Sequence, residues 1–150
     1  MANKRYAFIK ANWHAEIVEQ ALEGFRRDIG DADIAVFDVP GAFEIPLLAR
    51  DLAATGSFDA VVGAAFVVDG GIYRHEFVAS TVLEGMMRAQ MDANVSVLSV
   101  VLTPHNFQET DVQRKFFREH FVQKGAEAAR AARAIGEVRV AISSAVAMGA

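Results

Sequence analysis

The stretch Gly63-Ala-Ala-Phe-Val-Val-Asp-Gly-Gly-Ile-Tyr-Arg-His-Glu-Phe-Val78 decides the fold of this chain. An apolar run ends in Gly70 and Gly71, and His75 follows where a helix is expected to begin. A glycine-rich turn between a strand and a helix exposes backbone N–H groups, and the helix N-terminus adds partial positive charge. The stretch therefore predicts a strand, a turn suited to an anion such as phosphate, and a helix in direct succession.

His75 stands beside this predicted turn. Histidine is the side chain whose ordinary pKa suits proton transfer near neutral pH, so a phosphate cradle next to it outlines a reaction site. The alternative is a plain strand–turn–helix corner with a surface histidine, because short glycine motifs often match by chance. Asp69 and Glu76 lie nearby in the sequence and either tune the histidine or are simply solvated.

Outward from this stretch, apolar segments of strand type alternate with amphipathic segments of helix type. Strands are expected at Tyr6–Lys10, Ile34–Val39, Ala60–Val68 and Val95–Leu102, and helices at Ala15–Ile29, Glu44–Ala54, His75–Asp92 and Asp111–Ile135. The last helix is expected to be interrupted near Lys124-Gly125, since glycine commonly ends a helix. The alternation predicts a parallel sheet covered by helices on both faces. The tail, residues 138–150, is apolar and is left unassigned.

Composition and length bound the class of protein. The length of 150 residues predicts a single domain, residues 1–150. Hydrophobic residues make up 53% and charged residues 23%, which is typical of a globular chain. A net charge of −4 without a Lys/Arg cluster argues against a nucleic-acid partner. No apolar run approaches the roughly 18 residues of a membrane span, and the absence of cysteine fits a cytoplasmic protein.

In parallel α/β sheets, ligands bind beyond the carboxyl ends of the strands. The first strand delivers Trp13, the only tryptophan, which is either core filler or a ring that stacks on a flat heterocycle. The second delivers Glu44, which either complements the dipole of the next helix or accepts hydrogen bonds from ligand hydroxyls. The remaining histidines have no metal-ligand spacing, so no metal site is expected.

Five blocks of the chain together resemble the lumazine synthase family. They are Asn12-Trp-His14, Pro40-Gly-Ala-Phe-Glu-Ile-Pro46, the Gly-Gly turn with His75, Val101-Leu-Thr103 and Gln123-Lys-Gly-Ala-Glu-Ala-Ala129. They occur in the order and approximate spacing of that family, and the resemblance covers about residues 5–135. It implies a flavodoxin-like, three-layer α/β/α fold with a four-stranded parallel sheet.

The resemblance also implies an activity in riboflavin biosynthesis. The reaction condenses 5-amino-6-(D-ribitylamino)uracil with 3,4-dihydroxy-2-butanone 4-phosphate to 6,7-dimethyl-8-ribityllumazine, phosphate and water. An amine attacks the ketone to give an imine, phosphate leaves, and the ring closes. The resemblance implies no cofactor and no metal, small-molecule substrates, and a homo-oligomer without a nucleic-acid or membrane partner.

Each site residue is carried over from a matching position in the blocks. The resemblance assigns the pyrimidine and ribityl chain to Trp13, His14, Ala42, Phe43, Glu44, Phe66, Val67, Val68 and Ser99. It assigns the phosphate to Gly70, Gly71, Ile72 and one arginine, Arg114, with Arg118 as the alternative. It makes His75 the catalytic histidine.

The chain departs from the common family pattern at several points. The turn Asp69–His75 lacks the usual threonine and is one residue longer, and Ser99–Thr103 lacks the usual aromatic residue. These departures resemble the divergent second type of the enzyme, which forms decamers of two stacked pentamers with sites shared between neighbours. A weakly active or inactive relative that binds a flavin or lumazine is the alternative. The retained His75 and glycine turn favour the enzyme.

Overall fold

A computed structural model describes residues 3–69 and 74–149. Within these residues, four strands form one sheet in the order β2-β1-β3-β4, and every pairing is parallel. The strands are β1 (Arg5–Ala11), β2 (Asp33–Val39), β3 (Ala60–Phe66) and β4 (Ser96–Leu102). This is the strand order of flavodoxin-like sheets, with the topological switch point between β1 and β3.

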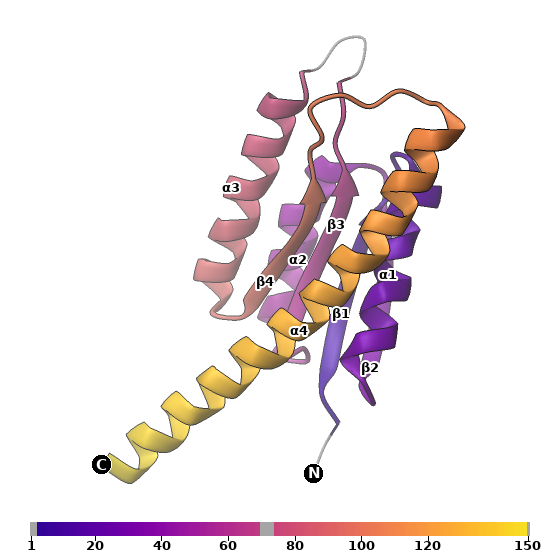
Figure 1. The fold of residues 1–150 in the computed structure, drawn as a ribbon. Helices are drawn as coiled ribbons and strands as arrows, with labels where there is room; N and C mark the ends of the chain where they lie inside the picture. The colour runs from indigo at the N-terminus through magenta and orange to yellow at the C-terminus, as the bar shows by residue number, and fades with distance from the viewer. Residues whose placement is uncertain (1–2, 70–73, 150) are drawn as a thin grey trace.

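Helices cover both faces of the sheet (Figure 1). They are α1 (Ala15–Ile29), α2 (Ile45–Ala54), α3 (His75–Ala93) and α4 (Asp111–Gly149), with a short 3-10 turn at Ala42–Glu44 before α2. One apolar core lies between the sheet and α2 with α3, and the other lies between the sheet and α1 with α4. The predicted three-layer α/β/α architecture is therefore confirmed.

Strand β3 is the centre of both cores. All seven of its residues are buried, as the uninterrupted apolar run predicts. At Gly63, a Cβ atom would lie 2.6 Å from Cγ2 of Ile45 and 2.8 Å from Cε of Met86. The missing side chain lets α2 and α3 approach the sheet, so this glycine serves packing rather than a turn.

The interruption predicted near Lys124-Gly125 is wrong, because α4 runs unbroken for 39 residues. A Cβ atom at Gly125 would lie 1.9 Å from the carbonyl oxygen of Ala21 in α1. Reciprocally, a Cβ at Gly24 in α1 would lie 1.9 Å from the carbonyl oxygen of Val122 in α4. The two glycines allow the helix backbones to touch, and neither of them ends a helix.

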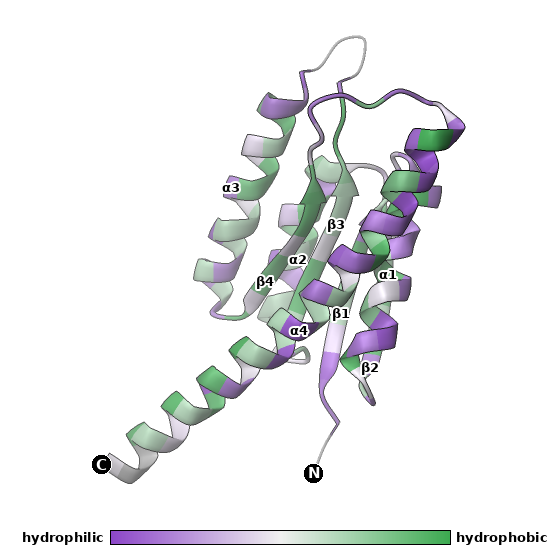
Figure 2. Cartoon of the chain, in the orientation of Figure 1, coloured by the Kyte–Doolittle hydropathy of each residue, from purple (hydrophilic) through white to green (hydrophobic). Residues whose placement is uncertain are grey.

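The last part of α4 runs past the sheet, beyond the edge at which the strands begin (Figure 1). It includes residues 138–149 of the tail, for which the sequence predicted no secondary structure. Among its described residues, five large apolar side chains are exposed: Val140, and four that share one face of the helix, namely Ile135, Val138, Ile142 and Val146. We call the four residues on one face, Ile135, Val138, Ile142 and Val146, the α4 stripe. Figure 2 shows green, hydrophobic bands along this overhanging part of α4. None of the described helices has an apolar stretch long enough to cross a membrane.

Candidate active site

Trp13 and Phe43 form an exposed aromatic pair where β1 and β2 end. Their ring centroids are 6.4 Å apart and their planes meet at 88°. Trp13 is 39% exposed and Phe43 is 44% exposed. A Cβ atom at Gly41 would lie 2.4 Å from Cε2 and Cζ2 of the indole, so the ring rests against the backbone there. Trp13 is therefore held from one side and open to solvent, unlike a core residue.

Glu44 organises the turn between β2 and α2. Its Oε2 accepts a hydrogen bond of 2.9 Å from the backbone N–H of Gly41. Ala42 is fully buried beneath this turn, while Glu44 is exposed. The carboxylate thus closes the turn that carries Phe43, and a carboxylate has capacity to accept further hydrogen bonds. This contact is compatible with the helix-start role, and the ligand role of Glu44 stays a prediction.

His14 joins an aromatic cluster that the sequence did not predict. Its backbone is left-handed, with φ of 52° and ψ of 50°, and its carbonyl accepts the first hydrogen bonds of α1. Its ring lies edge-on to Phe66 at 5.5 Å and to Phe107 at 5.3 Å. Phe66 is fully buried, and Phe107 comes from the segment after β4. The only signal for Phe107 in the sequence is an aromatic residue soon after a predicted strand end.

Val67 and Val68 continue the chain beyond β3. Val67 is buried, and its N–H donates a 2.9 Å hydrogen bond to the carbonyl of Leu102 in β4. Val68 is half-buried. The Val67 N–H therefore already has a partner within the chain. The predicted strand end at Val68 is two residues too long, although Val67 still pairs with β4.

His75 begins α3 with its side chain 15% exposed. Oδ1 of Asp69 accepts a 2.7 Å hydrogen bond from the His75 backbone N–H and lies 2.8 Å from Nδ1 of the ring. Oε2 of Glu76 lies 3.3 Å from the same Nδ1. The backbone hydrogen bond from His75, followed by that from its ring, lowers the pKa of Asp69 below its ordinary value.

The ligand atoms of Asp69, His75 and Glu76 lie within 4.8 Å of one another, a spacing that could hold a cation. Both carboxylates are exposed, however, and such groups commonly gather without a metal. The predicted phosphate residues Gly70, Gly71 and Ile72 lie outside the described residues.

Arg114 stands in the first turn of α4, where its N–H bonds to the carbonyl of Thr110. Its Nε lies 3.9 Å from Glu16 Oε1, and one terminal nitrogen lies 3.7 Å from Glu109 Oε2. Glu16 is in the first turn of α1, next to the carboxyl end of β1. Such long, partly exposed ion pairs are weak, so the guanidinium can exchange them for a phosphate at small cost. The alternative, Arg118, is half-buried in the same helix.

Ser99 is set apart from the other predicted site residues. It pairs with Gly63 in the middle of β4, and its Oγ accepts a 3.1 Å hydrogen bond from the N–H of Val101. The other predicted residues described above lie at strand ends or at helix starts. Because β4 is an outer strand and β3 lies between it and β1, Ser99 is apart from Trp13, which follows β1, and from Glu44, which follows β2.

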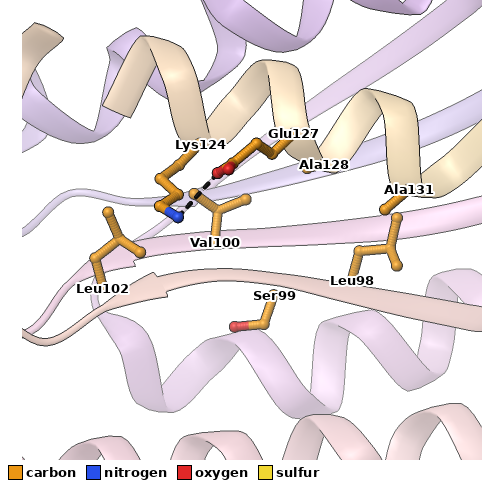
Figure 3. A pocket seen from close by; sticks show the side chains of 8 residues that line it. All are labelled: Leu98, Ser99, Val100, Leu102, Lys124, Glu127, Ala128 and Ala131. Atoms are coloured by element: carbon orange, nitrogen blue, oxygen red, sulfur yellow. Dashed lines mark ion pairs between the residues drawn. The ribbon is translucent and has the colours of Figure 1, made fainter. Parts of the chain in front are cut away.

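A pocket of about 310 Å³ lies between β4 and α4 (Figure 3). Its lining residues are Leu98, Ser99, Val100, Leu102, Lys124, Glu127, Ala128 and Ala131. Nζ of Lys124 lies 2.9 Å from Oε2 of Glu127, and this hydrogen bond lowers the pKa of Glu127. Figure 3 shows Ser99 pointing away from this ion pair, on the other side of the strand. Lys124 and Glu127 both belong to the motif block Gln123–Ala129, but the sequence did not predict a pocket there.

Comparison of the sequence with known proteins places this chain in a family. The family model described as 6,7-dimethyl-8-ribityllumazine synthase matches residues 3–139. A 6,7-dimethyl-8-ribityllumazine synthase of Rhodococcus erythropolis is 55% identical over 133 residues, covering 85% of this chain and 86% of that protein. The 6,7-dimethyl-8-ribityllumazine synthase 2 of Pseudomonas syringae pv. tomato is 52% identical over 133 residues, covering 85% and 78%. The synthase 2 of Bradyrhizobium diazoefficiens is 50% identical over 131 residues, covering 85% and 79%. This chain therefore belongs to the 6,7-dimethyl-8-ribityllumazine synthase family.

Proposed function

We propose that this protein is a transferase of riboflavin biosynthesis. It condenses 5-amino-6-(D-ribitylamino)uracil with 3,4-dihydroxy-2-butanone 4-phosphate to give 6,7-dimethyl-8-ribityllumazine, phosphate and water. The observation that carries this proposal is the 55% identity to a named synthase over 133 residues, 85% of the chain. The absence of cysteine is compatible with the cytoplasmic location that belongs to the same proposal.

The site geometry supports a division of roles. Trp13 and Phe43 offer exposed rings, on which a flat pyrimidine can stack. His75 moves the protons of imine formation and ring closure, since its ring is fixed at the start of α3. Arg114 supplies the positive charge opposite the phosphate, and Arg118 remains the alternative. Gly70 and Gly71 belong to the same proposal as donors to the phosphate, and both lie outside the described residues.

The decisive experiment mixes both substrates with the purified protein, without added metal or nucleotide, and follows lumazine fluorescence. A protein-free reaction is the reference, because the uncatalysed condensation can be appreciable. The rate should rise in proportion to protein concentration. His75→Ala should slow it by roughly 10- to 10⁴-fold if the histidine is the principal proton carrier. A rate equal to the reference, with riboflavin still bound, would instead identify a flavin- or lumazine-binding module.

We further propose that the chain assembles into pentamers and that two pentamers stack into a decamer. The pocket beside β4 supports an interface at this edge of the sheet, because it is lined by apolar residues such as Leu98 and Leu102. The spacing of three and four residues along α4 runs from Ala128 and Ala131 of that pocket into the α4 stripe. A neighbouring copy could therefore cover the pocket and the stripe together.

The position of Ser99 supports a site shared between neighbours. It lies on an outer strand, apart from Trp13 and Glu44 of its own chain. A closed ring repeats one heterologous contact at every interface. Such a contact would bring Ser99 and Arg114 of one copy to the Trp13 side of the next.

A further inference from the structure

One oxygen of Asp69 holds His75 at two points. Oδ1 lies 2.7 Å from the backbone nitrogen of His75 and 2.8 Å from Nδ1 of its ring. Asp69 follows β3, and His75 is the first residue of α3, so the contact spans the connection between the two elements. The same carboxylate therefore fixes where the helix begins and how the imidazole is turned.

This contact decides which ring nitrogen carries the proton. An ionised carboxylate can only accept hydrogen bonds, so Nδ1 must be the donor. In neutral imidazole the other nitrogen, Nε2, then carries the lone pair and is the atom that can accept a proton. The lowered pKa of Asp69 keeps its carboxylate ionised at neutral pH, where the reaction would run. Asp69 orients the ring and itself exchanges no proton.

Two other charged groups surround His75 among the described residues. Oε2 of Glu76 lies 3.3 Å from Nδ1, while its Oε1 lies 2.5 Å from a guanidinium nitrogen of Arg74. Arg74 also lies over the ring of Phe77, 5.3 Å from its centroid. Glu76 is thus shared with an arginine and is farther from Nδ1 than Asp69 is. It makes a matched control, because it is a second carboxylate near the same nitrogen.

We propose that Asp69 is the positioning residue that holds the neutral ring of His75 as the Nδ1–H tautomer, leaving Nε2 to exchange the proton with substrate. This proposal rests on the proposed condensation for its kinetic consequence. The structural half, which is the tautomer and the ring orientation, can be measured without any turnover.

The test compares Asp69→Asn with Glu76→Gln in the full-length protein. For Asp69→Asn we expect kcat to fall by about 10- to 100-fold, by analogy with lost partners of metal-bound histidines. The KM values should change little, because the side chain positions a base and does not contact substrate. Nitrogen-15 NMR of the His75 ring should show Nδ1–H as the main neutral form in the wild type. The Nε2–H form should increase in Asp69→Asn, while Glu76→Gln should leave kcat and the tautomer nearly unchanged.

A double variant separates positioning from mere support of the helix start. If Asp69 acts through His75, Asp69→Asn should cause no further loss of rate in the His75→Ala background. A loss there as large as in the wild type would overturn the proposal, as would an Nε2–H tautomer in the wild type. A wild type that shows the Nδ1–H tautomer and its shift in Asp69→Asn, but no condensation, would uphold the positioning contact and reject the proposed function.

Discussion

Trp13 is supported on one side by the backbone of Gly41 and is open on the other. Because no side chain stands between the indole and that backbone, the ring lies where the Gly41 Cβ would otherwise be. The backbone at Gly41 has a φ of −155°, an extended conformation that any residue adopts. Glycine is therefore needed here for space and not for its backbone conformation. It makes room for the ring.

Trp13 is the only tryptophan, so its emission reports on the site. We expect riboflavin or a substrate analogue to quench this emission, because a stacked heterocycle contacts the exposed ring. Trp13→Ala should weaken binding by on the order of 1–3 kcal/mol, as for base–aromatic stacking. Calorimetric titration of wild type and variant measures the difference. Emission that ignores saturating ligand would show that no ligand stacks on Trp13.

Helices α1 and α4 are joined by charge at one end of their contact. The carboxylate of Asp28 lies 2.5 Å from a guanidinium nitrogen of Arg130 and 3.1 Å from one of Arg133. Arg133 also donates to the backbone carbonyl of Asp28. These hydrogen bonds, that from Arg133 foremost, lower the pKa of Asp28 below its ordinary value of 3.8.

The pH dependence of stability follows from the sign of this shift. A carboxyl whose pKa is lower in the folded state stabilises the fold above its ordinary pKa, and the stabilisation is lost as pH falls through the folded pKa. Asp28→Asn should therefore lower the Tm at pH 7. The difference from wild type should shrink as the pH falls below 3.8. Thermal unfolding across this range checks it, and a difference independent of pH would contradict the ionic explanation.

The close approach of α1 and α4 gives a second test at the scale of elements. Alanine is normally a better helix residue than glycine by about 1 kcal/mol. At Gly125 the new Cβ would collide with the Ala21 carbonyl, so Gly125→Ala should destabilise the protein despite that gain. At Gly136, in the same helix, no atom lies within 4 Å of the added Cβ. Gly136→Ala should therefore be neutral or stabilising. Urea unfolding of both variants compares them, and equal effects would mean that the helices can separate freely.

In a single chain, one apolar surface on α4 is left exposed to solvent. The α4 stripe is exposed from 37% at Ile135 to 67% at Val146, on an overhang that the sheet does not cover. Apolar surface of this kind usually marks an interface. Val140 is also exposed, at 55%, but the helical period places it on the opposite face of α4.

Assembly can be measured directly. Light scattering should give a mass of about ten times 16.3 kDa, as the proposed decamer requires. Ile142→Asp, within the α4 stripe, should reduce this mass, because a charge would be buried at the interface. Val140→Asp is the matched control and should leave the mass unchanged. A stable, fully active monomer would contradict the shared site, and a hollow 60-subunit shell would refute the decamer alone.

Local patterns in the sequence determined most elements of this protein. The unbroken apolar run predicted β3 as a strand buried on both faces, and the helix expected at Ala15–Ile29 has these bounds, with Gly30 at φ of 82° after its end. Strands alternating with helices predicted the parallel, two-sided sheet. These features depend on neighbours within a few residues, so periodicity and glycine preference suffice to find them. The order of the motif blocks led to the family.

Tertiary structure alone decided the features that join distant residues. Gly125 looks like a helix break in the sequence, yet α4 continues through it because α1 packs against that point. Ser99 and Trp13 are predicted to bind the same substrate, and the sheet order shows that β3 separates the strands that carry or precede them. The contact of Asp69 with His75 depends on how the chain returns from β3 to α3. Such contacts are set by the packing of whole elements, and no local residue pattern encodes their distances.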